Sequence, residues 1–252
     1  MRVYHRIFVV ILFFVCLIFS YQVTAAQNLD DFPAKRDPAA NLSTEREKSE
    51  IYSKLRDRSC TTMTLDKCNC PDAREMKAYI DALIETGVGK EEIFYKVARK
   101  FSPNTILDKQ IKAKVEERLI KEAGGKIPQI ILEPASFDFA QLSKKQGKVQ
   151  KNFKLYNKGT AKLIITNIKV SCACTTVSLA VGENKSPYFG TQGAPAGWEA
   201  VIEPGKSGEL EVVVDLSHTS VAVGKLVRDI NIISNDILNP ESIVRIEAEI
   251  GD

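Results

Sequence analysis

The spacing of apolar residues changes once along this chain, close to Pro128. Before this point apolar residues recur every three or four positions, as on one face of an amphipathic helix. After it they alternate with polar residues, as on strands with one buried face. No helical pattern interrupts the second part. We therefore expect an α+β protein with two separate domains, a small helical bundle followed by an antiparallel, Ig-like β-sandwich.

Helical spacing predicts four helices, over residues 44–58, 71–86, 91–101 and 106–123. Thr44 and Glu47 fit a capping box at the start of the first helix. Pro71 suits the first turn of the second, where its missing N–H is not needed. Two adjacent glycines, Gly124 and Gly125, end the fourth helix.

Alternation predicts about seven short strands in the second part. They cover residues 137–139, 149–155, 163–165, 168–170, 210–216, 227–232 and 243–250. The segment 182–197 is rich in Gly, Pro and Ser and predicts a long inserted loop, which is either functional or mobile. Trp198 is expected to anchor the base of that loop in the core.

The first 26 residues have the parts of a secretory signal peptide. Arg2 and Arg6 precede an apolar run over residues 7–19, and small residues end the segment at Ala25 and Ala26. The apolar run is short of the ~20 residues that a membrane span needs. We expect cleavage after Ala25 or Ala26 and a periplasmic or secreted protein, the alternative being an uncleaved N-terminal anchor. No later apolar run predicts a membrane span.

These patterns give five segments. Residues 1–26 are the expected signal peptide, 27–42 a polar, proline-containing flexible spacer, and 43–125 the helical domain. Residues 126–133 are the expected linker, and 134–252 the β-sandwich domain.

Charge and histidine content exclude several functions. The chain has 35 basic and 32 acidic residues, and loss of the signal would remove two basic ones. This balance gives no electrostatic basis for nucleic-acid binding. Of the two histidines, His5 lies in the signal, so only His218 could serve a histidine-based zinc or catalytic site. His218 is expected to be a polar turn residue.

Two Cys-x-Cys pairs are the most informative feature after the signal. One of them is Cys172 and Cys174. On an extended strand their side chains would share a face, with Cα atoms roughly 6.5–7 Å apart, so a disulfide between them would be strained and easily reduced. Two thiolates on one face could also bind copper or zinc, or react with a partner's thiol. A small buried patch, or a bond to another cysteine, is the structural alternative.

The second pair, Cys68 and Cys70, precedes Pro71 and a predicted helix. A helix N-terminus stabilises a thiolate, so Cys70 should be the more reactive of the two. Cys60 lies in the same loop and could bond either one, closing a short ring. We treat Cys60, Cys68 and Cys70 as candidate redox thiols, and Cys172 and Cys174 as candidate metal ligands. No cofactor is established by these patterns; copper and zinc are the candidates.

The stretch from Cys60 to Leu107 resembles the soluble domain of CcmH-type cytochrome c biogenesis proteins. The matching residues are Cys60, Cys68-Asn69-Cys70-Pro71 and the run from Gly89-Lys90-Glu91-Glu92-Ile93 to Phe101. The resemblance implies a small helical bundle whose loop cysteines handle apocytochrome thiols. The family's typical Cys-x-x-Cys is replaced here by the wider spacing of Cys60 and the Cys68–Cys70 pair.

The second part resembles a bacterial Ig-like domain of unknown function. The resemblance rests on Phe137-Asp138-Phe139, Asn157-Lys158-Gly159, Ser171-Cys172-Ala173-Cys174-Thr175, Ile202-Glu203-Pro204-Gly205 and Ser234-Asn235. It implies a fold and an exported setting.

The sequence therefore favours an exported, non-enzymatic binding or assembly factor that handles thiols or metal, in c-type cytochrome maturation. Its expected partner is a protein, with apocytochrome or the maturation machinery as candidates. The alternatives are a thiol–disulfide oxidoreductase, a copper or zinc carrier that uses the Cys-x-Cys pairs, and a structural envelope protein whose cysteines staple loops. The absence of a phosphate-binding glycine loop or a catalytic motif weighs against a hydrolase or nucleotide enzyme.

Overall fold

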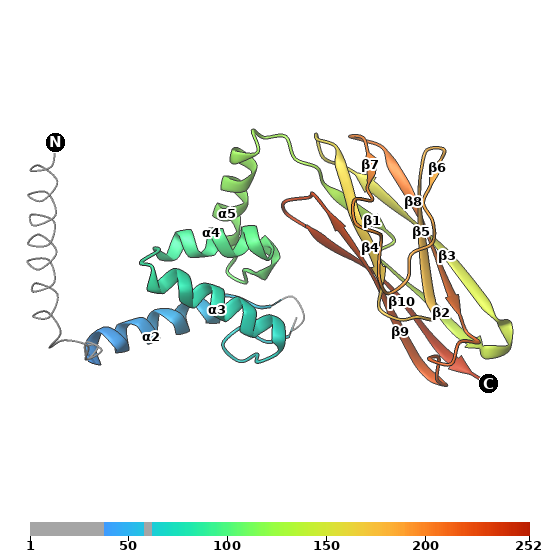
Figure 1. The fold of residues 1–252 in the computed structure, drawn as a ribbon, viewed down its shortest axis with the longest axis horizontal. Coiled ribbons are helices and arrows are strands. Elements are labelled where there is room, and N and C mark those ends of the chain that lie inside the picture. The colour runs from blue at the N-terminus through green and yellow to red at the C-terminus, as the bar shows by residue number, and fades with distance from the viewer. Residues whose placement is uncertain (1–37, 58–61) are drawn as a thin grey trace, which may run out of the picture. The chain divides into compact units, whose positions relative to one another are not determined.

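The computed structural model describes residues 38–57 and 62–252, with side chains from Thr44 onward. The expected signal peptide and Cys60 lie outside these residues. Residues Arg46–Asp252 form one compact unit. The described part is mostly β, with two sheets and four short α-helices (Figure 1). None of the helices in it is long and apolar enough to cross a membrane.

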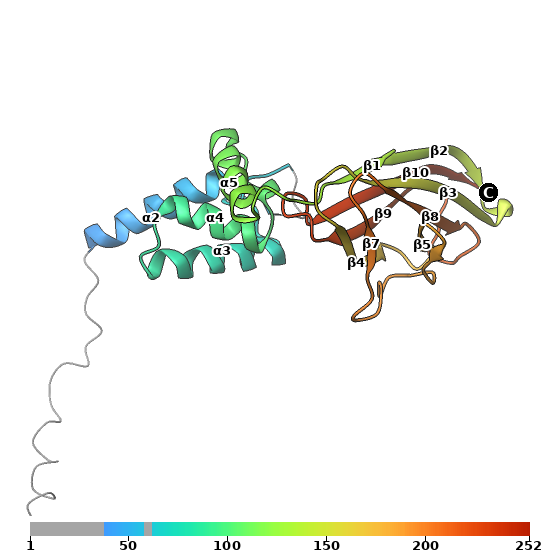
Figure 2. The ribbon, with the colours of Figure 1, turned by 90° about the horizontal axis from the view of Figure 1, so that it is seen from above.

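The helices are α2 (Pro38–Ser53), α3 (Pro71–Glu85), α4 (Lys90–Lys100) and α5 (Lys109–Glu122). They gather together in both views of the ribbon (Figures 1 and 2). A short 3₁₀ turn, η1 (Pro103–Thr105), precedes α5. Pro71 begins α3 as expected, and Asp108 caps α5 by accepting hydrogen bonds from the backbone N–H groups of Gln110 and Ile111.

Two predicted helix starts were wrong. The first helix begins at Pro38, so residues 38–42 are helical and not a flexible spacer, and the Thr44–Glu47 pattern lies inside the helix and not at its start. The last helix begins at Lys109 and not at Ile106, because Ile106 forms an isolated β-bridge with Leu55 instead. Asp108 then supplies the helix cap.

The helices and the segments that connect them share one core. Its fully buried side chains include Ile51, Leu55, Leu65, Met76, Ile80, Ile93, Phe94 and Val97. Spacings of three and four residues within this set are those of one helix face, which is why the helical periodicity was readable from the sequence.

The sandwich consists of ten strands in two five-stranded sheets. The first sheet has the order β1 (Ile130–Glu133), β3 (Lys148–Asn157), β8 (Ser207–Asp215), β5 (Thr175–Val181), β6 (Asn184–Lys185). The second has the order β2 (Ser136–Ser143), β10 (Glu241–Gly251), β9 (Gly224–Ser234), β4 (Leu163–Val170), β7 (Ala200–Ile202). Every pairing is antiparallel except that of β2 with β10, which is parallel.

The structure has more strands than the seven expected. Residues 130–133, within the expected linker, form β1 and pair with β3. The two runs 163–165 and 168–170 are one strand, β4, whose pairing with β9 shifts register between Ile165 and Asn167. β5 went unpredicted because its first five residues include four that are buried, which hides the alternation.

The sandwich core lies between the sheets. Phe153, Leu155, Ile165, Val212 and Ile232 are among its fully buried side chains. Trp198 packs against this core, with its ring 4.8 Å from that of Phe189 in an edge-on contact, as expected for the base of the long loop. That loop is partly structured, because it contains β6 and because its Phe189 forms an isolated bridge with Val177 of β5.

Candidate functional site

Cys172 and Cys174 lie in the short turn between β4 and β5, where the chain crosses from the second sheet to the first. The turn closes by a hydrogen bond from Thr175 N–H to Cys172 O at 3.1 Å. Further backbone bonds tie it to both sheets: Ser171 N–H donates to Asp229 O, and Asp215 N–H donates to Cys174 O. Cys172 and Cys174 therefore do not continue the strand, and the extended geometry considered for the pair does not apply, since the chain must bend here to change sheets.

The bend changes what the pair can do. Residues two apart in a bent chain lie closer than the extended spacing, so the strain expected of a disulfide on a flat strand does not apply. The two sulfurs are 2.8 Å apart. Cys174 is 2% exposed and belongs to the sandwich core, whereas Cys172 is only partly buried. Cys172 is thus the sulfur that a partner could reach.

Three donors surround the Sγ of Cys172. They are the thiol of Cys174 at 2.8 Å, the hydroxyl of Ser220 at 3.1 Å, and the backbone N–H of Cys174 at 3.5 Å. Donors of this kind favour a thiolate over a neutral thiol, because only the anion can accept from all of them.

Arg228 on β9 supplies the positive charge of the site. Its Nε donates to Cys174 Sγ at 3.0 Å, and its Nη1 donates to Val227 O at 2.8 Å. Within the described ranges Arg228 has no ion pair with a carboxylate. Its charge is therefore directed at the sulfur pair.

The electrostatics make Cys172 the acidic thiol of the pair. Burial raises the pKa of Cys172, but hydrogen bonds from Cys174 and Ser220 and the charge of Arg228 lower it by more. The net result is a pKa of about 7, below the ordinary value of 9.0. A thiol with a pKa near neutrality is substantially ionised at physiological pH, and the thiolate is the nucleophilic form. The arrangement is that of a reactive cysteine backed by a buried second sulfur.

His218 extends the site outward. Its Nδ1 lies 2.8 Å from Ser220 Oγ and accepts the Ser220 backbone N–H at 3.1 Å. His218 was expected to be a turn residue only. It does lie in the β8–β9 connection, but it also orients the serine that contacts Cys172.

The sulfur separation bears on the prediction that this pair binds a metal. Two thiolates on one tetrahedral zinc, each with a Zn–S bond of about 2.3 Å, stand roughly 3.8 Å apart. The 2.8 Å between Cys172 and Cys174 is shorter, and the guanidinium of Arg228 lies against Cys174 Sγ. A metal ion would have to push the two sulfurs apart and displace the guanidinium of Arg228. The arrangement is closer to that of a dithiol ready to form a disulfide.

The helical cysteines form a separate group. Cys70 is the N-cap of α3, and its Sγ accepts the Ala73 N–H at 3.4 Å, as the position before Pro71 predicted. The ligand atoms of Cys68, Cys70 and Asp57 lie within 4.8 Å of one another. The third expected thiol, Cys60, lies outside the described residues.

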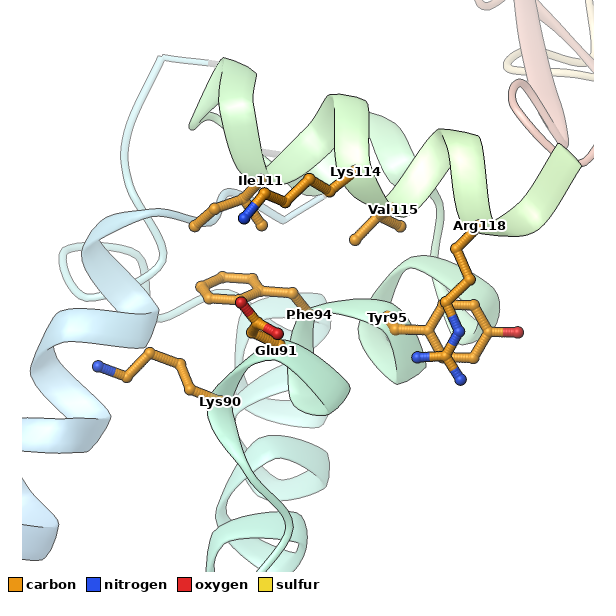
Figure 3. Close-up of a pocket in the computed structure, with 8 residues that line it drawn as sticks. All are labelled: Lys90, Glu91, Phe94, Tyr95, Ile111, Lys114, Val115 and Arg118. Carbon is orange, nitrogen blue, oxygen red and sulfur yellow. The ribbon is translucent and has the colours of Figure 1, made fainter. Parts of the chain in front are cut away.

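A cavity of about 260 Å³ lies between α4 and α5. Figure 3 shows Phe94 and Val115 at its apolar wall and Lys90, Glu91 and Lys114 around it. Arg118 lies over the ring of Tyr95, 3.5 Å from its centroid, and pairs with Glu92 and Glu122. Lys90 pairs with Glu50. Since Lys90 and Arg118 are already paired with carboxylates, the cavity is a weaker candidate site than the cysteine turn.

Comparison with known proteins bears on the sandwich part of the chain. Residues 130–187, which include both cysteines of the turn, match a family described as a protein of unknown function, DUF1573. No curated protein matches the chain. The expected resemblance to a domain of unknown function is thus confirmed over these residues, whereas the CcmH resemblance of residues 60–107 stays a prediction.

Solved structures also resemble part of the chain. A protein of unknown function from Porphyromonas gingivalis W83 is 19% identical with a TM-score of 0.38, and the match covers 49% of this chain and 47% of that protein's chain. The ASH/PapD-like domain 7 of human CEP192 is 8% identical with a TM-score of 0.31, and the match covers 50% of this chain and 87% of that domain. The E. coli chaperone DraB is 10% identical with a TM-score of 0.31, and the match covers 49% of this chain and 56% of the chaperone. This chain therefore spans about half the length of the P. gingivalis protein.

Two residues of the cysteine site, Arg228 and Ser220, were missed by sequence reasoning. A signal for Arg228 exists in the alternation of β9, where Leu226, Ile230 and Ile232 are buried and Arg228 shares their face. A charged residue on the inward face of a strand requires a partner near by. No comparable signal marks Ser220, because only the crossing of two loops at one end of the sandwich brings it to Cys172.

Proposed function

We propose that this protein is an exported thiol-handling protein that exchanges disulfides with a cysteine-bearing protein partner through Cys172 and Cys174. The observation that carries the proposal is the set of donors around the Sγ of Cys172, with the second sulfur 2.8 Å away. A nucleophilic thiolate and an adjacent resolving thiol are the two groups that disulfide exchange needs.

The exchange begins with the Cys172 thiolate. It attacks one sulfur of a partner disulfide, forming a mixed disulfide and releasing the other partner sulfur as a thiolate. Cys174 then gives its proton to the thiolate released in the first step and attacks Cys172 Sγ, which breaks the mixed disulfide and releases the second partner thiolate. The partner disulfide has gained two electrons and is reduced, and the Cys172–Cys174 pair has lost them and is oxidised.

Each residue of the site has a role in these steps. Ser220 and the backbone of Cys174 hold the attacking thiolate, with His218 orienting Ser220. Arg228 donates to Cys174 Sγ at 3.0 Å and so holds this sulfur next to Cys172 Sγ, the atom that it attacks in the second step. The same steps run in reverse would pass a disulfide from this protein to a partner dithiol.

The location of the protein and the identity of its partner are further parts of the proposal. The signal-like first 26 residues support a periplasmic or secreted location, where disulfides form and persist. The CcmH-like residues between Cys60 and Leu107 make the cysteine pair of an apocytochrome c the first partner to test. The match to a domain of unknown function assigns no activity, so the proposal rests on the geometry of the turn.

The proposal is tested with oxidised glutathione and the full-length protein. Reduced wild-type protein should form a Cys172–Cys174 disulfide and release two equivalents of glutathione, one from each step. In Cys174→Ser the second step is blocked, so a Cys172–glutathione mixed disulfide should accumulate and be found by mass spectrometry after digestion. Cys172→Ser should trap no adduct at Cys174.

The matched control is Cys68→Ser/Cys70→Ser, which leaves the turn intact and should exchange at the wild-type rate. Adduct formation at Cys174 in the absence of Cys172, or failure of wild-type protein to form the Cys172–Cys174 bond, would overturn the proposal. An exchange activity lost in the control but kept in Cys172→Ser would move the function to the helical cysteines.

A further inference from the structure

We infer that Asp57, Cys68 and Cys70 form a zinc site at the N-terminal end of α3, separate from the thiol-exchange pair. Two thiols and a carboxylate converge there, with their ligand atoms all within 4.8 Å of one another. Asp57 is 1% exposed and Cys68 2% exposed, and Cys70 is partly buried. The inference does not depend on disulfide exchange at Cys172.

Two separate segments of backbone bring the three groups together. The N–H of Leu65 donates to the backbone O of Leu55 at 2.7 Å. This bond holds the loop that carries Cys68 beside the segment that carries Asp57. Cys70 is fixed as the N-cap of a fifteen-residue helix. Ligands from two separate segments that the fold holds together are the arrangement of a structural metal site, whose coordination adds to the stability of the fold.

The spacing suits a metal better than that of the other cysteine pair. Two thiolates and a carboxylate around one tetrahedral zinc stand roughly 3.5–4 Å apart. Ligand atoms within 4.8 Å of one another reach that spacing with small side-chain movements. The sulfurs of Cys172 and Cys174, only 2.8 Å apart, do not.

The ligand types select zinc. Thiolates bind both Cu(I) and Zn²⁺, but a carboxylate oxygen is a hard ligand that zinc accepts and Cu(I) does not favour. Three protein ligands leave the fourth tetrahedral position to a water or to a further sulfur.

The surroundings fit an anionic cluster around a cation. Two deprotonated thiols and a carboxylate carry more negative charge than one zinc ion neutralises. Lys77 donates to Cys68 O at 2.7 Å and Arg74 donates to Asn69 O at 2.8 Å, which places two positive charges on the loop. The Ala73 N–H that donates to Cys70 Sγ is an outer contact of the kind that orients metal-bound thiolates.

The test is zinc binding by the full-length protein, purified with reductant under anaerobic conditions. We expect one zinc per chain, measured by elemental analysis. Cys68→Ser and Cys70→Ser should each lower zinc affinity by about tenfold or more, in competition with a chromogenic chelator. Asp57→Asn should weaken binding but keep both sulfur ligands. Cys172→Ser/Cys174→Ser is the matched control and should keep the full zinc content.

Cobalt substitution reads the ligands directly, independent of any loss of stability in a variant. Co²⁺ in the wild-type protein should give thiolate-to-cobalt charge-transfer absorption, which falls by about half in each single cysteine variant. Zinc content below stoichiometry in the wild type, zinc retained in Cys68→Ser/Cys70→Ser, or cobalt bound without thiolate absorption would each overturn the inference. If Cys68→Ser/Cys70→Ser loses zinc but still exchanges with glutathione, the zinc site is independent of the exchange at Cys172.

Discussion

The Nε of Arg228 lies 3.0 Å from the Sγ of Cys174, at a strand position whose neighbours on the same face, Leu226 and Ile230, are buried. A guanidinium on the inner face of a sandwich costs free energy unless it has a partner, and here the partner is a sulfur. The donors run in one direction, from Arg228 to Cys174 and from Cys174 to Cys172. The site is thus polarised toward its exposed sulfur.

Arg228→Gln should slow alkylation of Cys172. Loss of the positive charge raises the pKa of Cys172 from about 7 toward its ordinary value, so less thiolate is present at neutral pH. The rate of modification by iodoacetamide, followed by mass spectrometry over a pH series, should show its midpoint moved to higher pH. Arg245→Gln is the control, because Arg245 pairs with Asp229 on the same sheet and does not touch either sulfur. Equal midpoints in the two variants would contradict the role given to Arg228.

Ser220→Ala should have a similar effect through a lost hydrogen bond. Ser220 contributes more than Arg228 to lowering the pKa of Cys172. A hydrogen bond to a charged group is worth about 1.5 kcal/mol or more, so the thiolate fraction, and with it the alkylation rate at pH 7, should fall roughly sevenfold. Thr219→Ala, one residue away and exposed, should leave the rate unchanged. An unaltered rate in Ser220→Ala would show that the hydroxyl does not stabilise the thiolate.

The contrast between Arg228 and Ser220 shows what sequence can predict. Periodicity located the helices to within a few residues. The alternation of β9 also indicates that Arg228 faces inward, because the periodicity of a helix or a strand shows which of its faces is buried. The turn at Cys172 and Cys174 was not readable, since nothing local distinguishes a strand that continues from one that crosses between sheets. Ser220 reaches Cys172 only through that crossing, 48 residues away along the chain.

Gly159→Ala should destabilise the sandwich strongly. A Cβ at this position would lie 2.2 Å from Ile127 O and 2.5 Å from Gln129 N, both backbone atoms that cannot rotate away. Forced backbone displacement of this kind costs about 2 kcal/mol or more. Urea unfolding should show a lower midpoint than wild type. Gly190→Ala is the control, because its Cβ would meet nothing within 4 Å. Equal midpoints in both variants would contradict close packing of residues 127–129 on the β3–β4 turn.

Asp236→Ala should loosen the attachment of β1. The carboxylate is fully buried, and it accepts the N–H groups of Ile130 at 2.9 Å, Leu238 at 2.9 Å and Asn239 at 3.1 Å. Removing it leaves the buried N–H of Ile130 and the partly buried N–H groups of Leu238 and Asn239 without this acceptor, a loss of about 3 kcal/mol. The amides of β1 should exchange with deuterium faster than those of β10. Asp236→Asn, which keeps one acceptor oxygen, should recover part of the stability; no recovery would argue against the hydrogen bonds as the cause.

Stability under reducing conditions should rise between neutral and alkaline pH because of Cys172. Its pKa is about 7 in the folded protein and 9.0 in the ordinary, unfolded setting, so between these values the unfolded chain binds more protons. The contribution is therefore complete above about pH 9 and is lost as pH falls through about 7. Since Cys172 is partly exposed, solvent screening reduces the gain to about 1 kcal/mol.

Urea unfolding of the wild type and of Cys172→Ser at pH 6.5 and pH 9 measures this contribution. Every other titrating group is common to the two proteins, so the difference between their pH dependences belongs to Cys172. The wild type should gain more stability than the variant on going to pH 9. Parallel pH dependences would mean that Cys172 ionises no more readily in the folded protein than in the unfolded chain, and the site would then lack the thiolate that disulfide exchange requires.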